Sequence, residues 1–139
     1  MTEDLRLAIV VNPDLPQGLL ANTVGAIAIG IGAKLPVLAA RQLEDRQGRR
    51  IDVSSTLPVP ILQADAEALR RLLLKAQDGA DPAGAVVPFP AFARALHVYA
   101  DYETSMPDRD LGEEKIDGLG IAGPAKWVKS LTGALKLLR

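Results

Sequence analysis

The sequence predicts an α/β protein with a three-layer α/β/α sandwich fold, built as one domain. Its 139 residues are about the length of a single domain. Apolar residues make up 48% and charged residues 24% of the chain, which is enough to form a packed core. Short β-branched runs alternate with stretches of helical periodicity, and this order is typical of a sheet covered by helices. No internal repeat or linker divides residues 1–139.

The first elements are a buried strand, a loop and a helix. Leu5–Val11 is a β-branched run, typical of a strand that is buried on both faces. Residues Asn12–Gly18 are rich in turn-forming types and end the strand. Leu19–Gly32 follows as a helix with small side chains on nearly every face. Each interior glycine costs about 1 kcal/mol in helix propensity, which indicates that close packing on the sheet requires these residues.

The middle of the chain predicts a hairpin, a strand and an amphipathic helix. Arg41–Val53 is polar around Gln47-Gly48 and is typical of an exposed hairpin or excursion. Leu57–Leu62 carries two prolines, so it is an edge strand or the entry to one. Asp65 caps the helix Ala66–Gln77, whose apolar residues recur at helical spacing.

The second half predicts two strands and two helices before the end of the chain. Ala83–Pro88 is a short buried strand, and Pro90–Glu103 is an amphipathic helix. Ile116–Ile121 is a further strand. A helix with Pro124 at its first position runs to about Leu131. Ala134–Leu138 is a last strand or an extended tail.

Composition excludes several classes of function. Sixteen basic and seventeen acidic residues give a net charge of −1, which argues against a strongly basic nucleic-acid binder. The chain has no cysteine and one histidine, so we expect no metal site and no cofactor.

One stretch, Leu15–Ala33, is uncharged over a length near that of a bilayer span. It contains Pro16, Gln17 and four glycines, which favours a buried helix in a soluble core. The acidic N-terminus does not suit a secretory signal. We therefore expect a cytoplasmic protein without a membrane segment.

Two motifs have both a functional and a structural interpretation. Gly118–Gly123 satisfies G-x-G-x-x-G, but the residues after it are too few to complete a dinucleotide-binding βαβ unit. The helix N-terminus at Pro124 and the nearby Lys126 indicate an anion site or a purely structural turn. His97 and Asp101 are four residues apart on a predicted helix. This spacing suits a general base with its orienting carboxylate, and it equally suits an ordinary surface pair.

Charge is unevenly distributed near the C-terminus. Residues 101–114 contain six acidic residues and one basic residue, and residues 115–139 contain five basic residues and one acidic residue. These segments are either two solvated surfaces that attract each other or include a cationic patch for an anionic ligand.

Both ends of the chain resemble a known family. The C-terminal stretch resembles the terminal segment of type II peptidyl-tRNA hydrolases. The shared pieces are Leu119-Gly-Ile, Gly123-Pro-Ala, Thr132-Gly and Leu135-Lys-Leu. Ala8–Leu15 with Gly18 is similar to that family's first strand and its D-L-x-x-G-K loop. The chain resembles more closely the bacterial family called domain of unknown function 2000. This resemblance rests on the N-P-D-L-P-Q-G-L opening, the L-P-V-P-I-L segment and the G-P ending. That family is regarded as a divergent relative of these hydrolases.

The resemblance implies a mixed sheet of four or five strands and a homodimer. It does not carry over the hydrolase activity. Leu19 stands where those enzymes have a lysine, and Pro88-Phe89-Pro90 stands where they have an aspartate and a threonine. Losing these charges removes stabilisation of the transition state. Whether the protein is an enzyme therefore stays open, and the net charge does not support tRNA as a partner.

These observations lead to one main hypothesis and two alternatives. The main hypothesis is a domain without hydrolase activity that binds a small or anionic ligand where the first loop meets the Gly123 turn. The first alternative is a hydrolase of altered chemistry on an ester or amide, with Asp14 or the His97–Asp101 pair as base. The second is a dimeric interaction module that uses the apolar first helix or the charged surfaces. The candidate ligand-binding residues are Asn12, Asp14, Gln17, Asn22, Gly123 and Lys126.

Overall fold

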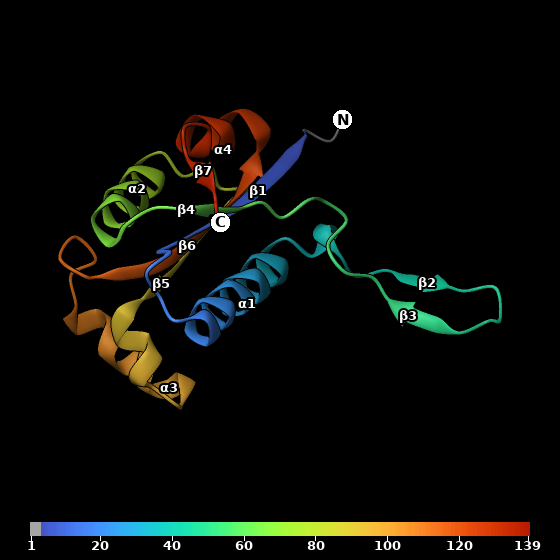
Figure 1. Ribbon diagram of the computed structural model, residues 1–139, viewed down its shortest axis with the longest axis horizontal. Coiled ribbons are helices and arrows are strands. Elements are labelled where there is room, and N and C mark those ends of the chain that lie inside the picture. The colour runs from blue at the N-terminus through green and yellow to red at the C-terminus, as the bar shows by residue number, and fades with distance from the viewer. Residues whose placement is uncertain (1–3) are drawn as a thin grey trace.

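A mixed five-stranded sheet forms the centre of the structure, a computed structural model that describes residues 4–139 (Figure 1). The strand order is β5-β6-β1-β4-β7. β1 and β4 are parallel, and every other neighbouring pair is antiparallel. The strands span Leu5–Val11 (β1), Ile61–Gln63 (β4), Ala85–Pro90 (β5), Ile116–Pro124 (β6) and Lys136–Leu137 (β7).

Helices cover both faces of this sheet. α1 (Gln17–Lys34) packs on one face, and α2 (Ala66–Asp78) and α4 (Ala125–Thr132) pack on the other (Figure 1). Successive residues of β1 alternate between the two cores: Ile9 packs with α1, and Val10 packs with α2 and α4. The predicted three-layer α/β/α arrangement is therefore confirmed for the described residues.

Glycines in β6 let α1 lie close to the sheet. A methyl group on Gly118 would come within 2.7 Å of the Thr23 methyl carbon, and one on Gly120 would overlap Ile27 and come within 2.7 Å of Ile31 Cδ1. Only a residue without a Cβ fits such contacts. The G-x-G-x-x-G match thus has a packing role, as expected from the exclusion of a dinucleotide fold.

α2 forms as the sequence predicts. The Asp65 carboxylate accepts a hydrogen bond of 2.8 Å from the Ala68 backbone N–H, which caps the first turn. Leu69, Leu73 and Ala76 recur at helical spacing and are fully buried. α2 therefore forms part of one core layer.

The helix predicted over Pro90–Glu103 is wrong. β5 continues to Pro90, a 3₁₀ turn follows over Ala91–Ala95, and α3 is limited to Tyr99–Ser105. Leu96 lies between them in an extended conformation, with φ −96° and ψ 126°. The apolar spacing there is helical, but the segment folds around a pocket instead of lying flat on the sheet.

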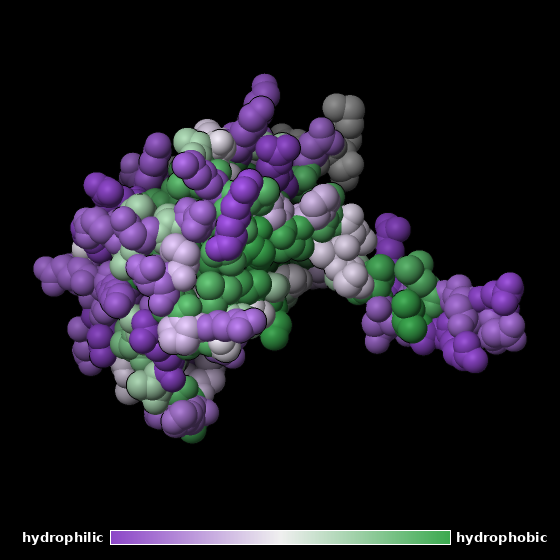
Figure 2. Space-filling model, in the orientation of Figure 1, coloured by the Kyte–Doolittle hydropathy of each residue, from purple (hydrophilic) through white to green (hydrophobic). Residues whose placement is uncertain are grey.

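A hairpin arm, Arg41–Val53, projects from the body beyond the C-terminal end of α1 (Figures 1 and 2). β2 (Gln42–Glu44) and β3 (Arg50–Asp52) pair in antiparallel register, and all residues from 41 to 52 are exposed. Arg49 pairs with Asp45 at the turn, at 3.2 Å. The predicted exposed hairpin is confirmed.

The remaining helical segments are short. Single 3₁₀ turns occupy Pro36–Leu38 and Met106–Asp108. Between residues 4 and 139, none of the helices combines the length and apolar character that a membrane crossing requires.

Candidate functional site

The first loop is anchored against the beginning of β6. The Asn12 backbone N–H donates to the Asp117 carbonyl at 3.0 Å, directly after the last paired residues of β1. The Asn12 side-chain oxygen accepts from the Asp14 backbone N–H at 3.0 Å, which closes an Asx turn. The side-chain oxygen of Asn12 thus shapes this loop.

An ion pair with a fully buried carboxylate lies next to this loop. The Asp117 carboxylate has no exposed surface. The Arg94 guanidinium donates two hydrogen bonds of 2.7 Å to it, from Nε and Nη2. This fork-like geometry is the strong, orientation-specific form of the contact. The bond to Asp117 raises the pKa of Arg94 above its ordinary value, so the guanidinium stays charged.

Arg94 also faces a pocket of about 460 Å³ between the N-terminal half of α1 and the segment that follows β5. Its side chain is 35% exposed, and two of its five N–H groups are used by Asp117. The outer edge of the guanidinium is therefore free to meet a second acceptor. The other residues of the pocket are mostly apolar or aromatic: Leu19, Asn22, Phe89, Ala93, Leu96, His97, Val98, Tyr99 and Tyr102.

Aromatic rings stiffen one wall of this pocket. The Tyr102 ring lies 5.6 Å from Phe92 and 6.2 Å from Tyr99, measured between centroids, and the Arg109 guanidinium lies 4.0 Å above Phe92. Burial, with a smaller effect of Tyr99, raises the pKa of the Tyr102 phenol above 10. Tyr102 therefore presents a neutral hydroxyl at physiological pH.

The predicted site residues separate into two groups. Asn12 and Asp14 follow the C-terminal end of β1, Gln17 and Asn22 lie in the first turns of α1, and Asn22 lines the Arg94 pocket. Gly123 pairs with Arg6 near the opposite end of β1, and Ala125 donates to the Asp4 carbonyl there. Arg6 and Asn12 are six residue steps apart along the strand, a distance of about 20 Å.

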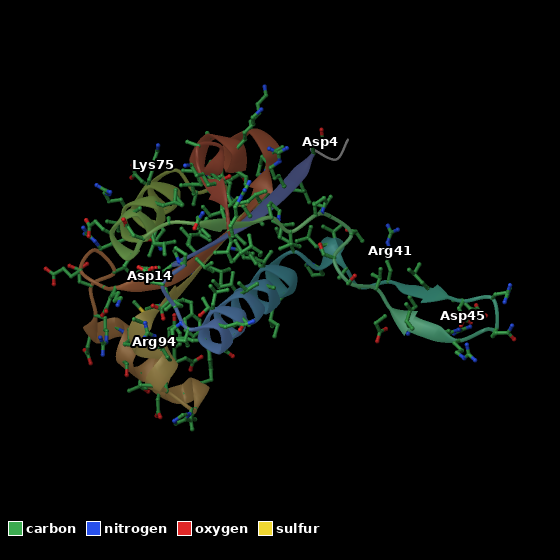
Figure 3. The ribbon with its side chains drawn as sticks, viewed as in Figure 1. Asp4, Asp14, Arg41, Asp45, Lys75 and Arg94 are labelled. Atoms are coloured by element: carbon green, nitrogen blue, oxygen red, sulfur yellow. The ribbon has the colours of Figure 1, made fainter. Side chains whose placement is uncertain are left out.

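The expectation that the first loop meets the Gly123 turn is therefore wrong, because β6 runs antiparallel to β1. Figure 3 shows Asp14 and Arg94 at one end of the sheet and Asp4 at the other. Lys126 lies with Gly123 and Asp4 at that other end, where it lines a different hollow. Ligand binding by these residues individually stays a prediction.

Gly123 itself has a structural role. Its φ of +151° lies outside the range that side-chain-bearing residues usually adopt. A methyl group there would also lie 3.2 Å from the Trp127 ring and 3.1 Å from Gly84 Cα. The residue thus permits β6 to turn into α4 beneath Trp127.

His97 and Asp101 do not lie on one helix, because α3 begins only at Tyr99. Both residues are exposed, and His97 alone lines the Arg94 pocket. The predicted helical pair is therefore wrong, although His97 remains close to the site.

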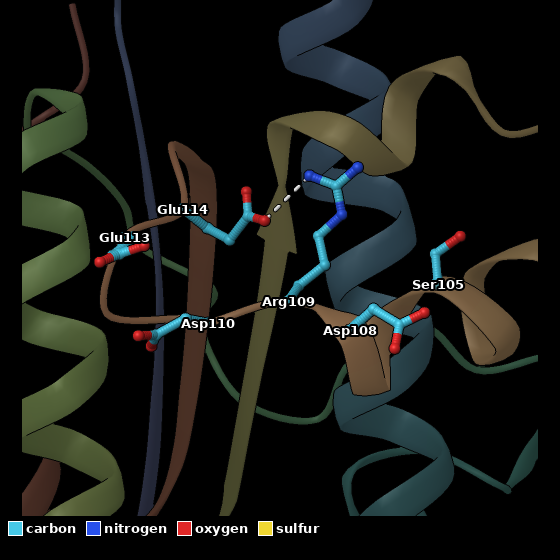
Figure 4. Close-up of a pocket in the computed structure, with 6 residues that line it drawn as sticks. All are labelled: Ser105, Asp108, Arg109, Asp110, Glu113 and Glu114. Carbon is cyan, nitrogen blue, oxygen red and sulfur yellow. Dashed lines mark hydrogen bonds and ion pairs between the residues drawn. The ribbon is translucent and has the colours of Figure 1, made fainter.

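The charged C-terminal segments do not pair with each other in the described part of the chain. The ion pairs found there join Arg109 to Glu114 at 2.9 Å within the acidic segment, and Asp117 to Arg94. Figure 4 shows a second pocket, of about 560 Å³, in which Arg109 points to Glu114 while the other carboxylates point apart. No group of metal-ligating side chains occurs among residues 4–139.

Arg94 and Asp117 were missed by sequence reasoning. A signal for Asp117 exists, since it is the single charge inside the apolar strand 116–122, and a buried carboxylate needs a cationic partner. No spacing rule identifies that partner as Arg94, which is 23 residues earlier in the chain.

The fold and the pocket define a three-layer mixed α/β protein with an arginine-containing pocket of mixed polar and apolar lining beside the end of its central strand. The chain belongs to the family described as "Protein of unknown function (DUF2000)", whose model matches residues 5–139. The predicted membership of this family is confirmed. The relationship to type II peptidyl-tRNA hydrolases stays a prediction.

A solved structure supports the same fold. It is that of the protein of unknown function Atu0240 from Agrobacterium tumefaciens strain C58, and it superposes with a TM-score of 0.86 over 98% of both chains at 19% sequence identity. A comparison with curated proteins found no significant match.

Proposed function

We propose that this protein binds a small anionic molecule with an apolar or aromatic portion in the Arg94 pocket, and that it does so without peptidyl-tRNA hydrolase activity. The observation that carries the proposal is the guanidinium of Arg94 at the wall of a ligand-sized pocket whose other lining residues are mostly apolar or aromatic. Small-molecule sites commonly combine apolar walls with a few oriented polar groups.

The electrostatics of the ion pair support an anionic ligand. Asp117 is wholly buried behind Arg94, so the positive side of the pair faces the pocket and the negative side faces the protein interior. Because Asp117 holds Nε and Nη2, the remaining N–H groups keep a fixed direction, and a ligand does not have to order the side chain. The Asn22 amide adds a polar group on the α1 side.

The apolar side chains support a ligand with more than a charged group. Phe89, Leu96 and the two tyrosines supply flat or branched surfaces around Arg94. Leu19 lines the same pocket, at the position where the resemblance places a lysine in the hydrolases. An apolar residue there favours binding of the ligand body over proton transfer.

The test uses phenyl phosphate and benzoate as minimal probes, with inorganic phosphate and benzyl alcohol as matched half-probes. We expect the two aromatic anions to perturb the amide resonances of residues 19–22 and 94–102 in solution NMR, and the half-probes to act more weakly.

The double variant Arg94→Gln/Asp117→Asn keeps a neutral hydrogen-bonded pair and should abolish the response. Arg71→Gln, on an exposed position of α2, is the control. Equal responses of the double variant and the wild type would refute the proposal.

A second variant tests the pocket without touching the ion pair. Leu19→Glu places a carboxylate at the pocket wall, and it should weaken binding of both anionic probes more than tenfold by repulsion. Leu19→Gln is its uncharged match and should retain most of the affinity.

The hydrolase of altered chemistry remains the second candidate because His97 lines the pocket and is a plausible general base. Incubation of the purified protein with peptidyl-tRNA and with simple esters tests it. Turnover that His97→Asn abolishes would support an enzyme, and turnover no faster than the blank would exclude it.

A further inference from the structure

The arm has an apolar face and a polar face. Leu43 and Ile51 stand directly opposite each other across its two strands and are 54% and 61% exposed. On the other face, the Gln42 amide donates to Asp52 at 3.2 Å, and Glu44 stands opposite Arg50. Such alternation is typical of a two-stranded sheet with one face covered.

Within the described chain, nothing covers that face. The two strands pack mainly on each other, and Figure 2 shows apolar side chains on the arm at a distance from the body. An isolated two-stranded hairpin is marginally stable in water. A covering surface from outside the described chain would therefore stabilise the arm.

The outer face of α1 is an apolar surface of matching character. No charged residue occurs between Gln17 and Ala33, and Ile29 is 76% exposed on this face. Gly25 and Gly32 flank Ile29 at helical spacing, and a methyl group on either would meet nothing within 4 Å. Each glycine lowers helix stability by about 0.5–1 kcal/mol, and the contacts within the chain do not require it.

We propose that the apolar face of the arm packs on the outer face of α1 in a second copy of this chain, and that the two copies exchange arms reciprocally. The lengths agree. α1 has 18 residues, about 27 Å, and the arm extends about six residues from its base to its turn, about 20 Å. Because the arm begins just beyond the C-terminal end of α1, a two-fold axis near its base aligns each arm with the partner's helix.

Charge complementarity supports this arrangement over another occupant. In the two-fold arrangement the tip of each arm reaches toward the N-terminal end of the partner's α1. The arm carries four arginines against three acidic residues. α3 lies beside that end of α1, on the far side of the Arg94 pocket, and exposes Asp101 and Glu103. Arg46, at the tip of one arm, would therefore approach carboxylates of the other copy, as complementary interfaces require.

Sedimentation velocity on the full chain tests the association. We expect the wild type to shift from 14.7 kDa toward twice that mass with increasing concentration. Leu43→Lys should keep the protein monomeric, since it buries an unpaired ammonium in the contact. Gln42→Lys is the matched control, because it adds the same charge one residue away on the polar face. A wild type that is monomeric at every concentration would overturn the proposal, as would a Leu43→Lys variant that still dimerises.

Site-specific cross-linking tests which surfaces meet. The chain has no cysteine, so a Leu43→Cys protein mixed with an Ile29→Cys protein contains one thiol in each partner. We expect disulfide-linked dimers mainly between the two different variants. Products formed mainly by Leu43→Cys with itself would indicate arm-to-arm contact and contradict docking on α1. The proposal is independent of ligand binding in the Arg94 pocket.

Discussion

At the scale of single residues, the ion pair between Arg94 and Asp117 both stabilises the fold and orients a side chain of the pocket. Replacing Arg94 with Gln leaves a fully buried carboxylate without its cation, and we expect a loss of about 3 kcal/mol in the free energy of unfolding. Urea denaturation measures this loss. Arg71→Gln, which removes an exposed arginine, should change stability by less than about 0.5 kcal/mol. Equal losses in the two variants would contradict a structural role for the pair.

Tyr102 gives a pH-dependent prediction. Its pKa is raised by burial, so the folded state favours the neutral phenol. This contribution to stability is complete below the pKa of the unfolded chain, near 10, and is lost as the pH rises through the higher pKa of the folded state. Ultraviolet titration should show the ionisation of Tyr102 above pH 10, and Tyr102→Phe should remove that step. An unchanged titration of the Tyr102→Phe variant would contradict the assignment.

Individual site residues could be predicted only in part. The polar side chains that gather after the first strand predict Asn22 as a site residue, and the structure places it at the Arg94 pocket. The prediction that Gly123 and Lys126 belong to the same site rests on the expectation that the carboxyl ends of the strands meet. That reasoning fails because spacing along the sequence does not reveal strand direction, and β6 is antiparallel to β1.

At the scale of elements, the glycines of β6 and α1 have opposite consequences. Gly120→Ala introduces a methyl group that overlaps Ile27 and Ile31, and it should lower the free energy of unfolding by about 1–3 kcal/mol. Gly25→Ala meets no atom within 4 Å and removes a helix-interior glycine, so it should raise that free energy by about 0.5–1 kcal/mol in the monomer. Thermal and urea unfolding of both variants at low protein concentration measure the difference. Changes of the same sign would refute this account of α1 packing.

The elements with a strong periodic signal were predicted well. β1, α1, α2 and the arm agree with their patterns within a few residues. The segment after β5 was predicted wrongly, because the spacing of Phe92, Leu96 and Tyr99 also fits a helix. Sequence periodicity shows that side chains share one side, but it does not show whether a sheet or a pocket receives them.

At the scale of the whole molecule, the arm should be dispensable for folding. Replacing residues 42–52 with a short Gly-Ser linker removes strands that pack mainly on each other, so the thermal midpoint of the monomer should be nearly unchanged. Calorimetry at low protein concentration measures it. The same replacement should abolish the concentration-dependent change in mass. A large fall in the midpoint would show that the arm stabilises its own body.

The pairing of β1 with β6 has a consequence for how the protein is made. Leu5 pairs with Pro124, so β1 lacks its β6 partner until residues 116–124 have been synthesised. Until then α1, which is uncharged from Gln17 to Ala33, has no β6 glycines to pack against and remains open to solvent. We therefore expect the uncharged segment 17–33 to be prone to aggregation in the nascent chain until β6 has been made.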